Sequence, residues 1–314
     1  MGARMPLNSQ DTTASFPYPG PTSHFYVSQR LRLHYVDWGN PGAEPLLMVH
    51  GGRDHCRSWD WVAQALRRDH HLVAPDLRGH GDSAWAVGGS YAIADLVYDL
   101  DQLVRQSGLA PVSIIAHSLG GAVSLLYAGL FPEAVRRLAV IEGTWQLDPA
   151  MSGRARLPVE QRMEGWIGQL RELAARSPRK YRSLDEAVER MRRESPHLTV
   201  EQARHLTRHG TQRNEDGTYS WKFDNHIRAY VPNRFTDEEV AGLWSRITCP
   251  VLLLHGSASR HADPRSLDLL RHFRQARSVE IADAGHWPHH DRLDEVLAAV
   301  RPFLAGDGAA GPRG

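Results

Sequence analysis

The stretch VSIIAHSLGGAVSLLYAGLF, residues 112–131, decides the fold of this 314-residue chain. Its first five residues, apolar except for Ser113, are typical of a strand buried on both faces of a sheet. Residues 119–131 have the pattern of a helix, which ends at Phe131-Pro132. Between them AHSLGG (116–121) matches the tight G-x-S-x-G turn of a nucleophilic serine, with Ala116 in the first glycine position. Ser118 therefore lies at a helix N-terminus, where backbone N–H groups favour developing negative charge.

Short strands and helices alternate on both sides of this stretch. We expect strands at 24–28, 31–36, 46–50, 71–74, 137–141, 250–255 and 279–281, and helices at 57–68, 91–107, 264–275 and 291–304. The alternation predicts an α/β fold with a mostly parallel sheet flanked by helices.

An Arg- and Glu-rich segment interrupts the alternation. Residues 145–240 carry helical patterns at 159–175, 183–194 and 199–209, with a turn at 215–217, and predict an inserted helical cap. The α/β core would then comprise 24–144 and 241–306. Residues 1–23 and 307–314 are predicted to be flexible end segments.

The composition excludes several classes of protein. Lys plus Arg is 37 and Asp plus Glu is 36, so the net charge of +1 argues against nucleic acid or an anionic membrane as partner. Two separated cysteines and scattered histidines predict neither a disulfide framework nor a metal site, and no cofactor is expected. No run of about 18 apolar residues indicates a membrane helix, and the N-terminus has no apolar signal region. We therefore expect a cytoplasmic protein; its oligomeric state stays open.

A serine nucleophile needs a base and an oxyanion site. DAGHW (283–287) follows the last expected strand and offers His286 as the base. HGG (50–52) follows an earlier strand, and the backbone N–H groups of Gly52 and Leu119 are placed to bind an oxyanion.

Five motifs in a fixed order identify a family resemblance. HGGRDHCRSW (50–59), APDLRGHGDSA (74–84), AHSLGG (116–121), PVLLLHG (250–256) and DAGHW resemble the α/β-hydrolase fold family, in the branch of epoxide hydrolases, haloalkane dehalogenases and similar serine hydrolases. The resemblance covers about residues 24–142 and 235–304. It implies a Ser-His-acid triad beneath a helical cap.

The acid of that triad departs from the usual pattern. Serine members of the family usually carry Asp three residues after the glycine of the seventh strand, but here that position is Ser259. An alternative family position lies after the sixth strand, where this chain has Glu142. We therefore predict Glu142 as the acid, with Asp263 as the runner-up.

The serine also limits the reaction. An aspartate that opens an epoxide or displaces a halide forms an ester that water can cleave, whereas a serine would form a stable ether. The sequence therefore predicts hydrolysis of a small-molecule carboxylic ester through an acyl-enzyme, with Trp145 at the cap entrance as a substrate contact. The alternatives are a C–C bond hydrolase of β-diketone-like substrates and a non-catalytic ligand-binding homologue. Cys56 lacks a strand-to-helix turn and is not expected to be the nucleophile.

Overall fold

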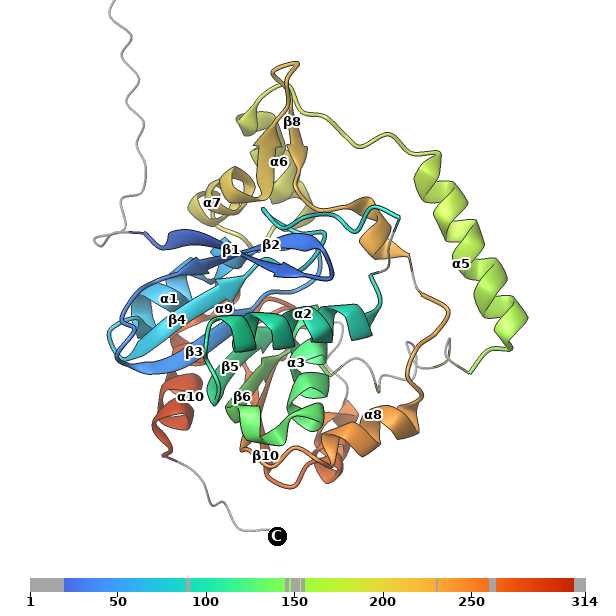
Figure 1. The fold of residues 1–314 in the computed structure, drawn as a ribbon. Coiled ribbons are helices and arrows are strands. Elements are labelled where there is room, and N and C mark those ends of the chain that lie inside the picture. The colour runs from blue at the N-terminus through green and yellow to red at the C-terminus, as the bar shows by residue number, and fades with distance from the viewer. Residues whose placement is uncertain are drawn as a thin grey trace, which may run out of the picture.

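One eight-stranded sheet organises the molecule (Figure 1). The computed structural model describes residues 20–88, 91–144, 147, 153, 156–229, 231–259 and 264–307. The strand order is β1-β2-β4-β3-β5-β6-β9-β10; β2 pairs antiparallel with β1 and β4, and the remaining neighbours are parallel. The strands are β1 (Thr22–Ser28), β2 (Leu31–Asp37), β3 (Glu44–Val49), β4 (His70–Pro75), β5 (Val112–His117), β6 (Val135–Ile141), β9 (Val251–Gly256) and β10 (Ala276–Ile281). The predicted fold class is confirmed.

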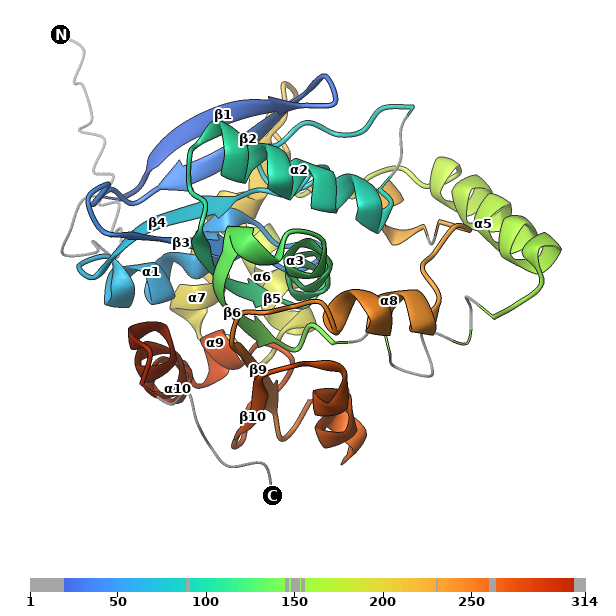
Figure 2. The same ribbon diagram turned by 60° about the horizontal axis from the view of Figure 1, so that its bottom comes forward.

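Helices cover both faces of this sheet (Figure 2). On one face lie α2 (Ile93–Gln106), α3 (Leu119–Leu130) and α8 (Asp237–Trp244), and on the other lie α1 (Asp60–Leu66) and α10 (Leu293–Ala305). All six residues of β5 are buried, because this central strand has a helical layer on each side. Because both faces of β5 are covered, a substrate could approach this strand only at its carboxyl end.

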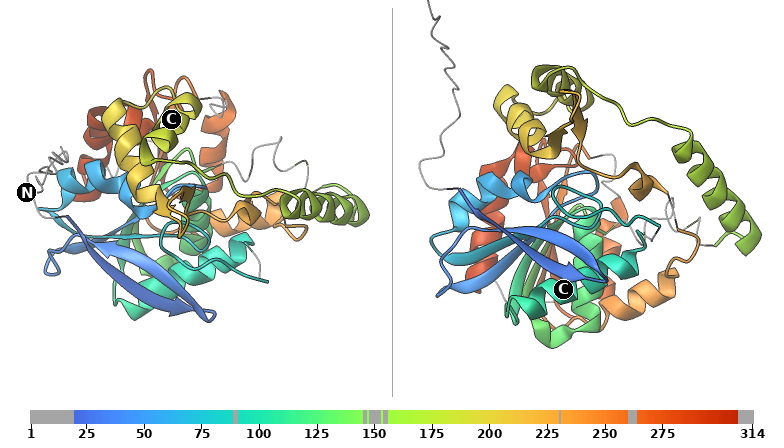
Figure 3. Two further views of the ribbon diagram at one scale, coloured as in Figure 1. Left: turned by 90° about the horizontal axis from the view of Figure 1, so that it is seen from above. Right: turned by 45° about the horizontal axis from the view of Figure 1, so that its top comes forward.

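The inserted segment lies above the carboxyl ends of the parallel strands (Figure 3). It contains α5 (Val159–Ala174), α6 (Leu184–Glu194), α7 (Val200–Gly210) and a small hairpin of β7 (Thr211–Arg213) and β8 (Tyr219–Trp221). The predicted turn at 215–217 closes that hairpin, with Gly217 at a φ of 82°. Helix α6 packs on α7, whereas α5 extends away from the rest of the molecule in both views.

Three local features differ from the sequence expectations. Residues 264–272 form a 3-10 helix (η5, Pro264–His272) rather than the first part of an α-helix. Its leucines lie at positions 267, 269 and 270. The stretch 57–68 splits into a 3-10 turn (η1, Cys56–Trp59) and α1. Residue 240, the expected end of the cap, lies inside helix α8 rather than at its boundary. This helix packs on α3 of the core.

Three further short helices are described: α9 (Pro288–Asp291) precedes α10, a 3-10 turn at Pro132–Ala134 leads into β6, and η4 (Asn225–Arg228) follows β8. In the part of the chain that the structure describes, no helix combines the length and the apolar character needed to cross a bilayer.

Candidate active site

Ser118 occupies a strained turn between β5 and α3. Its φ of 48° and ψ of −113° lie in a region that residues with a side chain rarely adopt. The neighbouring glycines explain how the turn fits. A Cβ on Gly120 would lie 2.4 Å from the carbonyl oxygen of Val49, and one on Gly121 would lie 2.9 Å from Cα of Gly143. The small residues of the motif are therefore required by the close approach of α3 to its neighbours.

The structure brings three of the predicted residues into one hydrogen-bonded line. His286, in the loop after β10, has its Nε2 at 3.1 Å from Oγ of Ser118. Its Nδ1 lies 3.3 Å from Oε2 of Glu142, which directly follows β6. Both contacts are satisfied by the tautomer with the proton on Nδ1, which we assign on that ground. In this state Nε2 has the lone pair that can accept the Ser118 proton.

Glu142 is held by the backbone and by a second serine. Its Oε1 accepts a hydrogen bond from the Gly256 N–H, and its Oε2 accepts one from the Ser259 hydroxyl, both at 2.8 Å. The side chain is only 2% exposed. Burial raises the pKa of Glu142, but the hydrogen bonds from His286, Gly256 and Ser259 outweigh it and hold the pKa below its ordinary value. The carboxylate therefore stays charged beside the imidazole.

Ser259 is a residue whose contribution the sequence did not reveal. The sequence shows only that the usual aspartate is absent at this position. In the structure its hydroxyl orients the Glu142 carboxylate from the neighbouring strand end. One signal could have indicated the hydrogen bond between Ser259 and Glu142: a hydroxyl stands at the usual acid position, and a glutamate ends the preceding strand of the core.

The loop after β3 lies against the serine turn. A Cβ on Gly51 would lie 3.2 Å from the Cβ of Ser118, and one on Gly52 would lie 3.9 Å from a side-chain carbon of Leu119. The two residues expected to supply oxyanion donors are thus neighbours beside the serine. Their use as donors stays a prediction. Trp145 and Asp263, the expected substrate contact and the alternative acid, lie outside the described residues.

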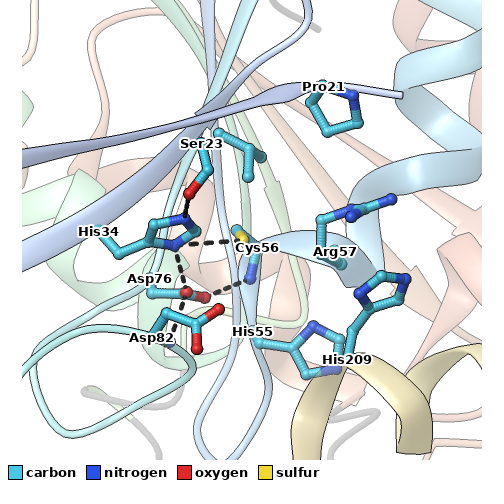
Figure 4. Close-up of a pocket in the computed structure, with 10 residues that line it drawn as sticks. Pro21, Ser23, His34, His55, Cys56, Arg57, Asp76, Asp82 and His209 are labelled. Atoms are coloured by element: carbon cyan, nitrogen blue, oxygen red, sulfur yellow. Dashed lines mark hydrogen bonds and ion pairs between the residues drawn. The ribbon is translucent and has the colours of Figure 1, made fainter. Parts of the chain in front are cut away.

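A polar pocket lies apart from this site. It is a cavity of about 150 Å³ whose walls contain none of the three hydrogen-bonded residues (Figure 4). In it Asp76 accepts hydrogen bonds from Nδ1 of His34 and from the backbone N–H groups of Cys56 and Asp82, at 2.7 to 2.9 Å. Burial raises the pKa of the Cys56 thiol well above its ordinary value, so the thiol is a poor nucleophile.

Comparison with known proteins places the chain in a family. A family model described as alpha/beta hydrolase fold matches residues 44–293, and the chain belongs to this family. Esterase Rv0045c of Mycobacterium tuberculosis is 26% identical over 290 residues, covering 91% of this chain and 90% of that protein. Lipase 1 of Psychrobacter immobilis is 25% identical over 276 residues, covering 87% and 80%. The crystal structure of the hypothetical protein PA1622 from Pseudomonas aeruginosa PAO1 gives a TM-score of 0.76 at 27% identity, covering 90% and 98%.

The family match confirms the resemblance drawn from the five sequence motifs. Together with the esterase and lipase relatives, it supports a hydrolase.

Proposed function

We propose that the protein is a serine hydrolase that cleaves carboxylic esters of small molecules through an acyl-enzyme. The observation that carries the proposal is the continuous contact from Ser118 through His286 to Glu142 at the carboxyl ends of the strands. A nucleophile, a base and an orienting carboxylate in this order form the arrangement that activates a serine at neutral pH. The similarity to an esterase and a lipase supports the same class of reaction.

The geometry suggests a role for each residue. Ser118 attacks the ester carbonyl while His286 takes its proton, and Glu142 stabilises the imidazolium that forms. The backbone N–H groups of Gly52 and Leu119 bind the oxyanion of the tetrahedral intermediate. His286 then protonates the leaving alcohol. In the second half-reaction it activates water, which attacks the acyl-enzyme carbonyl, releases the acid and restores Ser118.

The segment between β6 and α8 would select the substrate. We propose that residues 145–240 act as a cap over the serine and that Trp145 contacts the substrate. A covered site of this kind favours small soluble esters over lipid aggregates.

A fluorophosphonate probe tests the nucleophile directly. We expect stoichiometric labelling with the adduct on the peptide that contains Ser118, and no labelling of Ser118→Ala. Ser124→Ala is the matched control, because Ser124 is fully buried in the same helix and should not affect labelling. An adduct on any other residue would contradict the proposal.

A substrate panel tests the reaction. p-Nitrophenyl esters of increasing acyl length should be hydrolysed, and a vinylogous diketone should be cleaved at least about tenfold more slowly. Cleavage of the diketone alone would indicate a C–C bond hydrolase. Probe labelling without turnover of either class would leave the chain with a reactive serine but refute the ester-hydrolase proposal.

A further inference from the structure

Three polar side chains gather on the side of the serine turn that faces the oxyanion loop. His117 is the last residue of β5, Asp54 lies in the loop after β3, and His289 belongs to α9. One ligand atom from each of the three lies within 4.8 Å of the other two. Both imidazoles are only 1% exposed, and the carboxylate is half-buried. None of these residues has a role in the proposed ester hydrolysis.

His117 has the orientation of a metal-bound histidine. Its Nε2–H donates to the backbone carbonyl of His286 at 2.7 Å, which leaves the lone pair on Nδ1. That Nδ1 is buried and has no hydrogen-bond partner among the described residues. Burial lowers the pKa of His117 well below its ordinary value, so the ring is neutral. Histidines that bind metals usually donate their second ring N–H to a carbonyl or carboxylate in this way.

His289 provides a second unpartnered imidazole. Neither ring nitrogen has a hydrogen-bond partner in the described part of the chain, although the ring is fixed by stacking on Trp59 with 4.7 Å between centroids. Burial, together with the neighbouring histidines, holds the pKa of His289 well below its ordinary value. Burying a polar group without a partner is costly, so two such rings beside a carboxylate indicate that something else binds them.

We propose that Asp54, His117 and His289 form a binding site for a divalent transition-metal ion, with Zn²⁺ as the best match. Two imidazole nitrogens and one carboxylate oxygen are the ligand set of a three-residue zinc site that leaves the fourth position open. Bonds of about 2 Å to a common centre require small side-chain rotations from the present separations. A cation bound there would give the half-buried Asp54 carboxylate a counter-charge.

Two other groups of potential ligands are less suitable. In the pocket of Figure 4, His34, Cys56 and Asp76 also lie close together, but Nδ1 of His34 is already 2.7 Å from an Asp76 oxygen. The third group is formed by Asp60, His205 and His209. Its Asp60 carboxylate already accepts three hydrogen bonds from the guanidinium of Arg57, whose positive charge would repel a cation.

Ion binding should reduce ester hydrolysis, an effect that rests on the proposed function. His117 directly precedes Ser118 and is bonded to the carbonyl of His286, while Asp54 lies two residues beyond Gly52. An ion that draws these side chains together shifts the oxyanion loop against the nucleophile. Because the ion would bind beside the substrate rather than in its place, kcat should fall while KM changes little.

The binding test does not depend on activity. The protein is treated with a chelator and dialysed, then titrated with ZnCl₂ by calorimetry and with CoCl₂ while the visible d–d absorption is recorded. We expect one site per chain and a tetrahedral Co²⁺ spectrum. His289→Gln should weaken Zn²⁺ binding by at least about tenfold, since even the loss of an outer hydrogen-bond partner costs 10–100-fold. Asp54→Asn, on the half-buried loop, should weaken it similarly.

His290→Gln is the matched control. It is equally a buried histidine of α9, but it is not among the three ligands, so it should keep full Zn²⁺ affinity. Circular dichroism and thermal unfolding establish that each variant folds. Ser118→Ala should bind Zn²⁺ normally, which separates this site from failure of the esterase proposal.

The proposal is overturned if the wild-type protein binds no Zn²⁺ at micromolar concentration. It is equally overturned if binding survives in both Asp54→Asn and His289→Gln. Loss of binding in Cys56→Ser or His209→Gln, with these two variants unaffected, would assign the ion to one of the other groups.

Discussion

Replacing Glu142 by glutamine removes one charge next to His286 while preserving shape. The carboxylate oxygen lies 3.3 Å from Nδ1, and the side chain is 2% exposed. At an effective dielectric constant of about 20, two unit charges at this distance attract by about 5 kcal/mol. That attraction exists only once His286 is protonated, so it stabilises the transition state and not the free enzyme. Its loss corresponds to a fall in kcat of about 10³–10⁴-fold.

The hydrogen bonds of Glu142 add a second reason for this loss. The glutamine oxygen would keep the bond from the Gly256 N–H, which places the amide NH₂ at Oε2, against Nδ1 of His286. The NH₂ group then donates to Nδ1, so the ring proton moves to Nε2. In that tautomer the ring cannot accept the Ser118 proton, as expected when a triad acid becomes an amide.

Steady-state kinetics with a p-nitrophenyl ester measure the effect, and KM should change little because the Glu142 side chain is buried and hardly accessible to an ester. Two controls accompany it. Ser259→Ala removes one hydrogen bond to the carboxylate and should cost about tenfold or less. Asp263→Asn should cost less than about tenfold. A loss of less than tenfold in Glu142→Gln, or a larger loss in Asp263→Asn, would refute the assignment of the acid.

Four further outcomes are expected. Ser118→Ala should keep its thermal unfolding profile and lose at least about 10⁴-fold in kcat, since triad members act as a unit; residual turnover near wild type would contradict this. Gly120→Ala should lower the free energy of unfolding by about 1–3 kcal/mol or more, because the new Cβ would lie 2.4 Å from the Val49 carbonyl oxygen; denaturant titration measures it. Emulsified long-chain triglycerides should be hydrolysed more slowly than soluble short-chain esters, and a rate increase at the lipid–water interface would argue against a covered site. Burial lowers the pKa of His80 from 6.5 to about 4, so the unfolded state binds a proton more readily than the folded state. The free energy of unfolding should therefore fall as the pH decreases from 6.5 toward 4. Urea titrations at pH 7 and pH 5 measure this fall, which His80→Asn should reduce.

Local sequence was sufficient for the serine turn and the framework around it. A strand buried on both faces needs a largely apolar run, and residues 112–116 of β5 are apolar except for Ser113. The turn after it needs small residues at fixed positions, because backbone approaches of 2.4 Å to a Cβ leave no room for a side chain. Both requirements concern residues close together in the chain. The motif therefore predicts the turn, and the alternation of strands and helices along the chain predicts the sheet.

Long-range geometry decided the rest of the site. Glu142 and His286 are separated by 144 residues, and their contact depends on the parallel pairing of β6 with β9 and of β9 with β10. That pairing also brings Ser259 to the carboxylate. From sequence alone, Glu142 and Asp263 were both eligible, because the number of residues between two side chains does not give their distance in space.

The sequence by itself determined the α/β-hydrolase fold and the position of a serine in a strained turn, since these follow from apolar periodicity and from the space that glycine leaves. Only the tertiary structure decided which carboxylate contacts His286. It also decided that Asp54, His117 and His289 meet beside the serine, although scattered histidines in the sequence gave no metal-binding pattern. Strands and turns form from neighbouring residues, whereas such clusters form where separate strand ends and loops converge in space.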